Sequence, residues 1–229
     1  MAMNLDRIVP FGRSLDEYRQ MFALTSQELA SKKILGVGDG PASFNAEATQ
    51  ISACITSIDP IYQFSGAEIQ RRFDAVVDNI ITQVINSPND WVWSYHKSPQ
   101  ALKTSRIRSL KTFLADYERG KRTGRYQVRA LPKLEFSDLS FDLALCSHLL
   151  FLYSQQLDRT FHLESIRELL RVSREIRIFP LLTLNLELSP YLELVTLEFL
   201  DRGYDVAIEP VAYELQKGAN SMLVLKHCE

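Results

Sequence analysis

The stretch KKILGVGDGPASFNAEA, residues 32–48, places three glycines within five positions, between an apolar run and a segment of helical character. The run KKILGV is short, apolar and ended by glycine, which predicts a buried strand. Pro41 stands where the first turn of a helix tolerates proline, and ASFNAEATQIS (42–52) follows as the expected helix. Because glycine has no Cβ, the bend can adopt positive φ and lie directly against a ligand. The stretch predicts a strand–loop–helix unit whose loop contacts a ligand.

The rest of the chain alternates strands and helices, with one interruption. Helices are expected at 14–24, 65–86, 99–120, 161–173 and 189–203, and strands at 32–37, 54–59, 125–130, 141–147, 175–182, 204–211 and 221–227. This alternation predicts a mostly parallel sheet with helices on both faces. The last two strands are joined only by AYELQKGAN, too short for a helical crossover, so they should pair antiparallel at the end of the sheet.

The 229 residues suit one α/β domain over 1–229, with the two helices of 65–120 inserted between the second and third strands. The formal net charge of −2 gives no global case for a nucleic-acid or membrane partner. The N-terminus lacks the apolar core of a secretory signal, so we expect a cytoplasmic protein. The three cysteines are too scattered for a disulfide framework or a zinc site, and HxxxH and CxxC are absent, so no metal centre is expected.

Two features stand where an open parallel sheet binds its ligand, beyond the carboxyl ends of the strands. Gly36 to Gly40 follow the first strand, and Asp59 ends the second, 19 residues after Gly40. A carboxylate there can accept both hydroxyls of a ribose, so we interpret the arrangement as an adenosine site. The dinucleotide fingerprint GxGxxG fails in both registers, since its sixth residue is Pro41 or Ser43, which disfavours an NAD(P)-dependent reductase. The P-loop fails too, because no GK[ST] follows.

Four segments resemble the class I S-adenosylmethionine-dependent methyltransferases, most of all a small bacterial branch of them. ILGVGDGPASF is similar to motif I, SIDP to the acidic end of the second strand, and SFDLALCSHLLFLY to motif IV. SIRELLRVSREIRIFPLL is similar to the family's helix and fifth strand. The resemblance implies a Rossmann-like fold of seven strands with the last antiparallel, S-adenosylmethionine as cofactor, and methyl transfer as the activity.

The resemblance also implies which residues hold the cofactor, all at the ends of strands: Gly36, Val37, Gly38, Asp39, Gly40, Asp59, Pro60, Ile61, Ala130, Leu131, Cys146 and Ser147. The glycine loop would hold the methionyl part, Asp59 the ribose, and Ile61 with Leu131 the adenine. His148 would lie next to the transferred methyl group as the candidate catalytic residue.

Two positions depart from the family pattern. Gly36 stands where the family usually has an acid that orients the methionine ammonium, and Ala130 where an acid often lies near the adenine amino group. Each missing charged contact would cost about 1–3 kcal/mol of affinity. A second hypothesis is therefore a non-catalytic protein that binds S-adenosylmethionine or S-adenosylhomocysteine, or a scaffold, with a degenerate site.

The methyl acceptor is not identified by the sequence, but a small molecule is favoured because 65–120 resembles a closed lid. The aromatic loop DWVWSYH (90–96) could form a wall over a planar or cationic substrate, or it could pin the two inserted helices together. The basic stretch 103–129 is interpreted as a solvated helix face, with an anionic substrate or RNA as the minority alternative.

Overall fold

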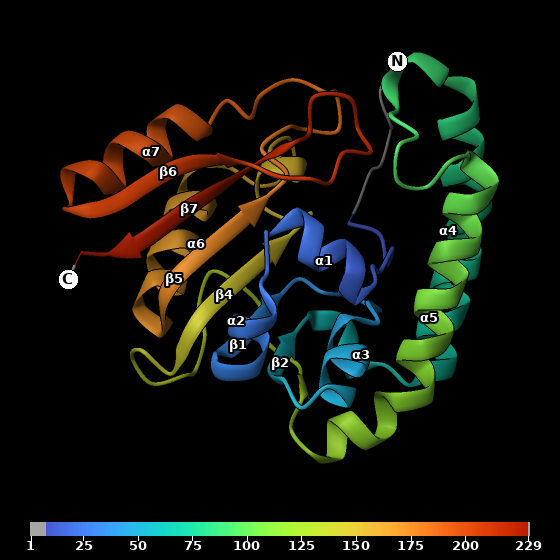
Figure 1. Cartoon of the computed structure of the whole chain (residues 1–229), viewed down its shortest axis with the longest axis horizontal. Coiled ribbons are helices and arrows are strands. Elements are labelled where there is room, and N and C mark those ends of the chain that lie inside the picture. The colour runs from blue at the N-terminus through green and yellow to red at the C-terminus, as the bar shows by residue number, and fades with distance from the viewer. Residues whose placement is uncertain (1–7, 229) are drawn as a thin grey trace.

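The computed structural model of the chain describes residues 8–228. Within these residues the strands form one seven-stranded sheet in the order β3-β2-β1-β4-β5-β7-β6 (Figure 1). Strand β7 runs antiparallel to both of its neighbours, and the other neighbouring pairs are parallel. The expected fold class is confirmed. The strands are β1 Lys33–Val37, β2 Cys54–Ile58, β3 Tyr126–Gln127, β4 Phe141–Ser147, β5 Ser173–Phe179, β6 Tyr204–Pro210 and β7 Ser221–His227.

Helices cover both faces of the sheet, and a long helical pair, α4 with α5, runs along one side of the molecule (Figure 1). The α-helices are α1 Leu15–Met21, α2 Ser26–Ser31, α3 Phe44–Gln50, α4 Gly66–Asn86, α5 Pro99–Arg122, α6 Arg159–Val172 and α7 Leu192–Asp201. Short 3-10 helices are η1 Pro60–Gln63, η2 Pro88–Asp90 and η3 Phe151–Tyr153. None of the helices in 8–228 is both long and apolar enough to span a membrane.

Two apolar cores lie on opposite faces of the sheet, and β4 contributes to both. Leu143 and Leu145 belong to the core under α1, α3 and the α4–α5 pair. Ala144 and Cys146 belong to the core under α6 and α7. This alternation is the period of two expected of a strand, with both faces buried as in a parallel sheet. The α4–α5 pair and the N-terminal helix α1 share the first of these cores, so they lie on the same side of the sheet.

The helix expected at 14–24 is shorter than expected, and a second short helix that was not expected follows it. Helix α1 ends at Met21, Ala23 takes a positive φ of 49°, and α2 begins at Ser26. The break has a local cause, because Thr25 and Glu28 form a capping box that starts a new helix. A second capping box, Ser14 with Glu17, starts α1.

The strand expected at 125–130 is reduced to the two residues of β3. Tyr126 and Gln127 pair with Ser57 and Ile58 of β2. Pairing stops there because β2 turns into η1 at Pro60, which leaves the residues after Gln127 without a partner strand. The strand expected at 175–182 ends at Phe179, just before a proline that cannot donate to a ladder.

Candidate functional site

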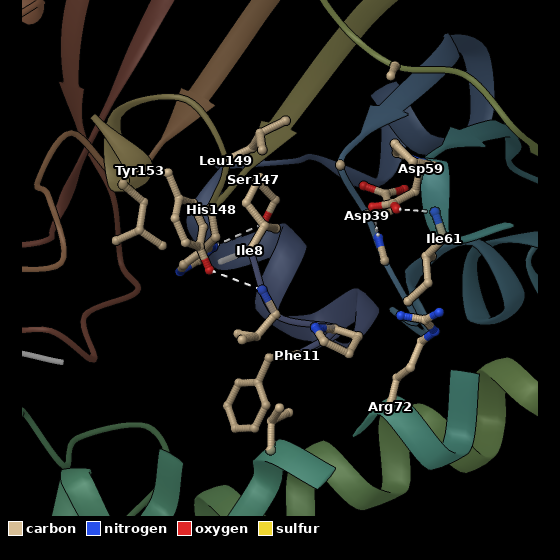
Figure 2. A pocket seen from close by; sticks show the side chains of 18 of the residues that line it. Ile8, Phe11, Asp39, Asp59, Ile61, Arg72, Ser147, His148, Leu149 and Tyr153 are labelled. Carbon is tan, nitrogen blue, oxygen red and sulfur yellow. Dashed lines mark hydrogen bonds between the residues drawn. The ribbon is translucent and has the colours of Figure 1, made fainter. Parts of the chain in front are cut away.

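A cavity of about 730 Å³ lies at the carboxyl ends of β1, β2 and β4 (Figure 2). Its volume falls in the range of roughly 300–1,000 Å³ that is usual for small-molecule sites. Most of the residues expected from the sequence to form the site line it, namely Gly38, Asp39, Gly40, Asp59, Pro60, Ile61, Ala130, Leu131, Ser147 and His148. Figure 2 shows Asp39 and Asp59 on one side and Ser147 with His148 on the other.

Three of the expected site residues do not line this cavity: Gly36, Val37 and Cys146. The side chains of Val37 and Cys146 face the α6 side of the sheet and are fully buried in its apolar core. Burial raises the pKa of the Cys146 thiol to about 12, so the group is a neutral core residue at physiological pH. Gly36 has a different role, set by the side chain of Asp39.

The Asp39 carboxylate folds back over Gly36. A Cβ added to Gly36 would lie only 2.0 Å from Asp39 Oδ2, so no side chain fits at position 36 while Asp39 keeps this rotamer. Tyr18 donates a hydrogen bond of 2.6 Å to Asp39 Oδ1, and Ser57 donates one of 2.5 Å to Oδ2. A carboxylate therefore does occupy the space beside residue 36, but residue 39 carries it.

Asp39 is poised between its charged and neutral forms. Burial raises its pKa from 3.8 to about 7, against the opposing effect of the two hydroxyl hydrogen bonds, and the nearby charge of Asp59 raises it further. A buried carboxylate of this kind is stabilised by a cation placed next to it. The cavity therefore offers a favourable place for a positively charged group beside the glycine loop.

Asp59 ties the end of β2 to the glycine loop. Its Oδ2 accepts a hydrogen bond of 2.9 Å from the Gly40 amide, and its Oδ1 accepts one of 2.8 Å from the Ile61 amide, which caps η1. Burial raises the pKa of Asp59 to about 6, although both amides act in the opposite direction. Each carboxylate oxygen has two lone pairs, so each can accept a ligand hydroxyl as well.

The loop after β4 brings Ser147 and His148 to the cavity. His148 has a positive φ of 51°, and its amide donates to the Phe179 carbonyl at 2.7 Å. Its Nδ1 lies 3.0 Å from Ser147 Oγ. Burial, then the charges of Arg13 and Arg106, hold the pKa of His148 well below 6.5, so the ring is neutral at neutral pH.

The segment 8–13 lines the cavity too, although the sequence did not predict a role for it. A Cβ on Gly12 would lie 2.2 Å from the Pro41 carbonyl oxygen, so the segment rests directly on the glycine loop. Val9 donates from its amide to the Tyr153 hydroxyl at 3.4 Å, which holds the segment across the cavity. The signal that could have revealed it is the apolar run IVPF (8–11), two residues before the α1 capping box.

Helix α4 and the turn before it form another wall, with Phe64, Glu68, Arg71, Arg72, Ala75, Val76 and Ile80. The guanidinium of Arg72 stacks over the Phe64 ring at 3.8 Å from its centroid. The aromatic loop lies outside this lining. Trp91 pairs with Gln216, and His96 Nε2 lies 3.1 Å from Glu17 Oε1, so the loop pins the inserted helices to the rest of the fold.

Across residues 8–228 there is no group of three His, Cys, Asp or Glu side chains placed to hold a metal ion. The chemistry available at the cavity comes from a buried carboxylate, a half-buried one, a neutral histidine, three arginines and an apolar wall. This set suits a ligand that carries sugar hydroxyls and a cation next to an apolar partner.

A relative of known sequence spans the same length. The uncharacterized protein MJ0045 of Methanocaldococcus jannaschii is 37% identical over 225 residues, which are 98% of each chain. The chain belongs to the MJ0045 family. No model of a protein family matches it. Because this relative is archaeal, the bacterial branch expected from the sequence stays a prediction.

Solved structures share the fold of this MJ0045-family chain. The magnesium protoporphyrin IX methyltransferase (ChlM) of Synechocystis PCC 6803, crystallised with S-adenosylmethionine, superposes with a TM-score of 0.50 at 12% identity, over 93% of this chain and 78% of that one. The methyltransferase domain of bacterial CtHen1 gives a TM-score of 0.50 at 12% identity, over 94% of this chain and all of that one. At such low identity the likeness shows the fold, which is that of class I methyltransferases.

Proposed function

We propose that this MJ0045-family chain is an S-adenosylmethionine-dependent methyltransferase that acts on a small-molecule acceptor. One observation carries the proposal: Asp39, which is buried, and Asp59, which is half-buried, flank a Cβ-free bend at the carboxyl ends of β1 and β2. A nucleoside that carries a cationic amino-acid tail needs one carboxylate for its ribose and one for its ammonium group. The methyltransferase fold supports the same conclusion.

The residues of the cavity fit this cofactor. A Cβ on Gly40 would meet nothing within 4 Å except Asp59 Oδ2 at 3.9 Å, so the bend is open on its ligand side. Asp59 would accept the ribose hydroxyls, and Asp39 would accept from the ammonium group. Ile61 and Leu131 provide apolar surfaces for the adenine. Ala130 offers no acid to the adenine amino group, so affinity would depend on the ribose and on the methionyl part.

When bound, S-adenosylmethionine supplies a methyl group already activated on a sulfonium, so the protein has mainly to position the acceptor and exclude water. An acceptor held beside His148 would gain this methyl group and would then have to lose a proton. His148, with its neutral ring beside Ser147, is placed to take that proton. The 8–13 segment and α4 would keep water from the reacting atoms.

The alternative is a protein that binds S-adenosylhomocysteine without catalysis, and the missing acid at Ala130 favours it. Calorimetric titration with S-adenosylmethionine and S-adenosylhomocysteine tests both readings. One-to-one binding supports the proposal, and the absence of binding at millimolar concentration rejects it. Binding without methyl transfer to any acceptor in a mixture of small metabolites would favour the alternative. A thermal-shift comparison of NADH with S-adenosylhomocysteine separates both from a reductase.

A further inference from the structure

The large cavity continues past His148 into a small inner chamber of about 40 Å³. Six residues line both spaces: Phe11, Arg13, Ile80, His148, Leu152 and Leu184. The remaining walls come from the inserted helices and from the loop between β6 and β7, with Trp91, Leu102, Arg106, Tyr213 and Gln216 among them. None of Gly38, Asp39 or Gly40 belongs to the chamber, so it lies on the far side of His148 from the glycine loop.

Three residues that line the chamber carry buried donor nitrogens without a hydrogen-bond partner in the described chain. They are Arg13 Nε, Arg106 Nε and Gln216 Nε2. A buried donor left unpaired costs about 1–3 kcal/mol, and more where the group is charged. Unpaired buried groups are few in native proteins, so three around one small space need an explanation. A ligand that accepts hydrogen bonds is the simplest one.

The side chains around the chamber also carry an excess of positive charge, which favours an anionic ligand. The guanidinium of Arg106 pairs with Glu17 at 2.8 Å, and both side chains are fully buried. Glu17 also accepts from the Tyr213 hydroxyl at 3.0 Å. Arg13 donates from Nη1 to the Phe11 carbonyl at 2.9 Å and, within residues 8–228, has no carboxylate within ion-pair distance. Two guanidinium groups therefore share one carboxylate.

The two nearby histidines do not change this excess of positive charge, because neither is charged. Burial lowers the pKa of His148 and of His96, so both rings are neutral near pH 7. Burial and the charge of Arg106 also lower the pKa of Arg13, which remains a cation at this pH because its ordinary value is 12.5. Arg13 is half-buried with its Nε fully buried, and a cation so far withdrawn from water is destabilising without a counter-ion. An anion in the chamber would remove that cost.

We propose that the inner chamber binds the carboxylate of the methyl acceptor, which makes the acceptor a small organic acid. The inference rests on the proposed function. A volume of about 40 Å³ exceeds the roughly 10–15 Å³ that one water molecule needs, so the chamber has room for a group of a few atoms such as a carboxylate. The acceptor's apolar body would lie against Phe11, Leu152 and Leu184, which line both spaces. Its nucleophilic atom would then reach the cofactor beside His148.

Acetate and its neutral isostere acetamide are the probes, and isothermal calorimetry is the measurement. The wild-type chain is expected to bind one acetate and to bind acetamide at least about tenfold more weakly. Arg13→Met should lose this preference, whereas Arg174→Met, which removes an exposed arginine near Asp142, should keep it. Gln216→Leu provides a second variant, because its backbone pairing with Trp91 does not need the side chain, and it should weaken acetate several-fold.

The same titrations with saturating S-adenosylhomocysteine distinguish the possible failures. Acetate affinity should be unchanged by the cofactor product, since the two occupy different sides of His148. If S-adenosylhomocysteine displaces acetate while 5′-methylthioadenosine does not, the chamber takes the cofactor's own carboxylate and the acceptor assignment is overturned. If S-adenosylhomocysteine binds and acetate does not at hundreds of millimolar, the inference fails and the proposed function stands. If only acetate binds, the proposed function fails instead, and with it the assignment of the chamber to a methyl acceptor.

Discussion

Asp39 Oδ2 lies 2.0 Å from the point where a side chain on Gly36 would begin, so the glycine at 36 and the acid at 39 form a matched pair. The absence of an acid at position 36 first suggests a degenerate site. The position of Asp39 supports another interpretation, in which the carboxylate has moved by three residues and still faces the glycine loop. Tyr18 and Ser57 fix its rotamer with hydrogen bonds.

Gly36→Ala should destabilise the protein, because its Cβ would displace the Asp39 carboxylate from its two hydroxyl partners. We expect a loss of about 1–3 kcal/mol in the free energy of unfolding, as for overpacking in a core. Urea denaturation measures the loss. Adding Asp39→Ala should restore part of the stability, since the clash then disappears. If the double variant is less stable than Gly36→Ala by the full cost of Asp39→Ala alone, the two residues are independent and the pairing is contradicted.

Asp39 should also give the free protein a pH-dependent stability. Its pKa in the folded chain, about 7, is above the ordinary value of 3.8, so the folded state binds more protons between these two values. The contribution of protonated Asp39 to the stability of the folded state is complete below about pH 4 and is lost as pH rises through about 7. The free energy of unfolding of Asp39→Asn should therefore rise relative to that of the wild type as pH rises, by up to about 4 kcal/mol. Urea denaturation at pH 5 and pH 8 measures this difference. An equal difference in stability between the two proteins at both pH values would contradict the raised pKa of Asp39.

Cofactor binding should be linked to the same proton. The ammonium group of S-adenosylhomocysteine favours the charged form of Asp39, so its affinity should rise from pH 6 to pH 8 and then level off, with release of a proton. Calorimetry in buffers of different ionisation enthalpy measures the protons exchanged. Asp39→Asn should bind more weakly with a flat profile. Proton uptake on binding to the wild type would be inconsistent with the assigned role.

Asp59→Asn should weaken S-adenosylhomocysteine binding by about 10- to 100-fold, the loss of one to two charge-assisted hydrogen bonds. An asparagine has one carbonyl oxygen, so it can no longer accept from both Gly40 and Ile61 while also accepting from a ribose. Calorimetry with Asp74→Asn, an exposed change on α4 outside the cavity, supplies the matched control. Equal affinities for the two variants would remove Asp59 from the site.

Local patterns in the sequence predicted the strands, the glycine loop and the position of Asp59, because periodicity and turn residues act over short distances. They could not predict that Asp39 folds back over Gly36, since side-chain direction in a loop depends on partners such as Tyr18 that are distant in sequence. Cys146 was placed in the site by the family resemblance, and the sequence pattern could not correct this, because β4 is apolar on both faces and does not show which residues turn toward the ligand. Arg13 was missed because its importance comes from burial and unpaired nitrogens.

The most direct test of the role of Asp39 transfers its carboxylate to position 36. Calorimetry would compare S-adenosylhomocysteine binding by the wild type, by Asp39→Ala and by the double variant Gly36→Asp with Asp39→Ala. We predict that Asp39→Ala weakens binding by at least about tenfold, or about 1.4 kcal/mol, and that the double variant recovers to within a few-fold of the wild type. Undiminished binding by Asp39→Ala, or a double variant no better than that single one, would contradict the claim that Asp39 supplies the carboxylate missing from position 36.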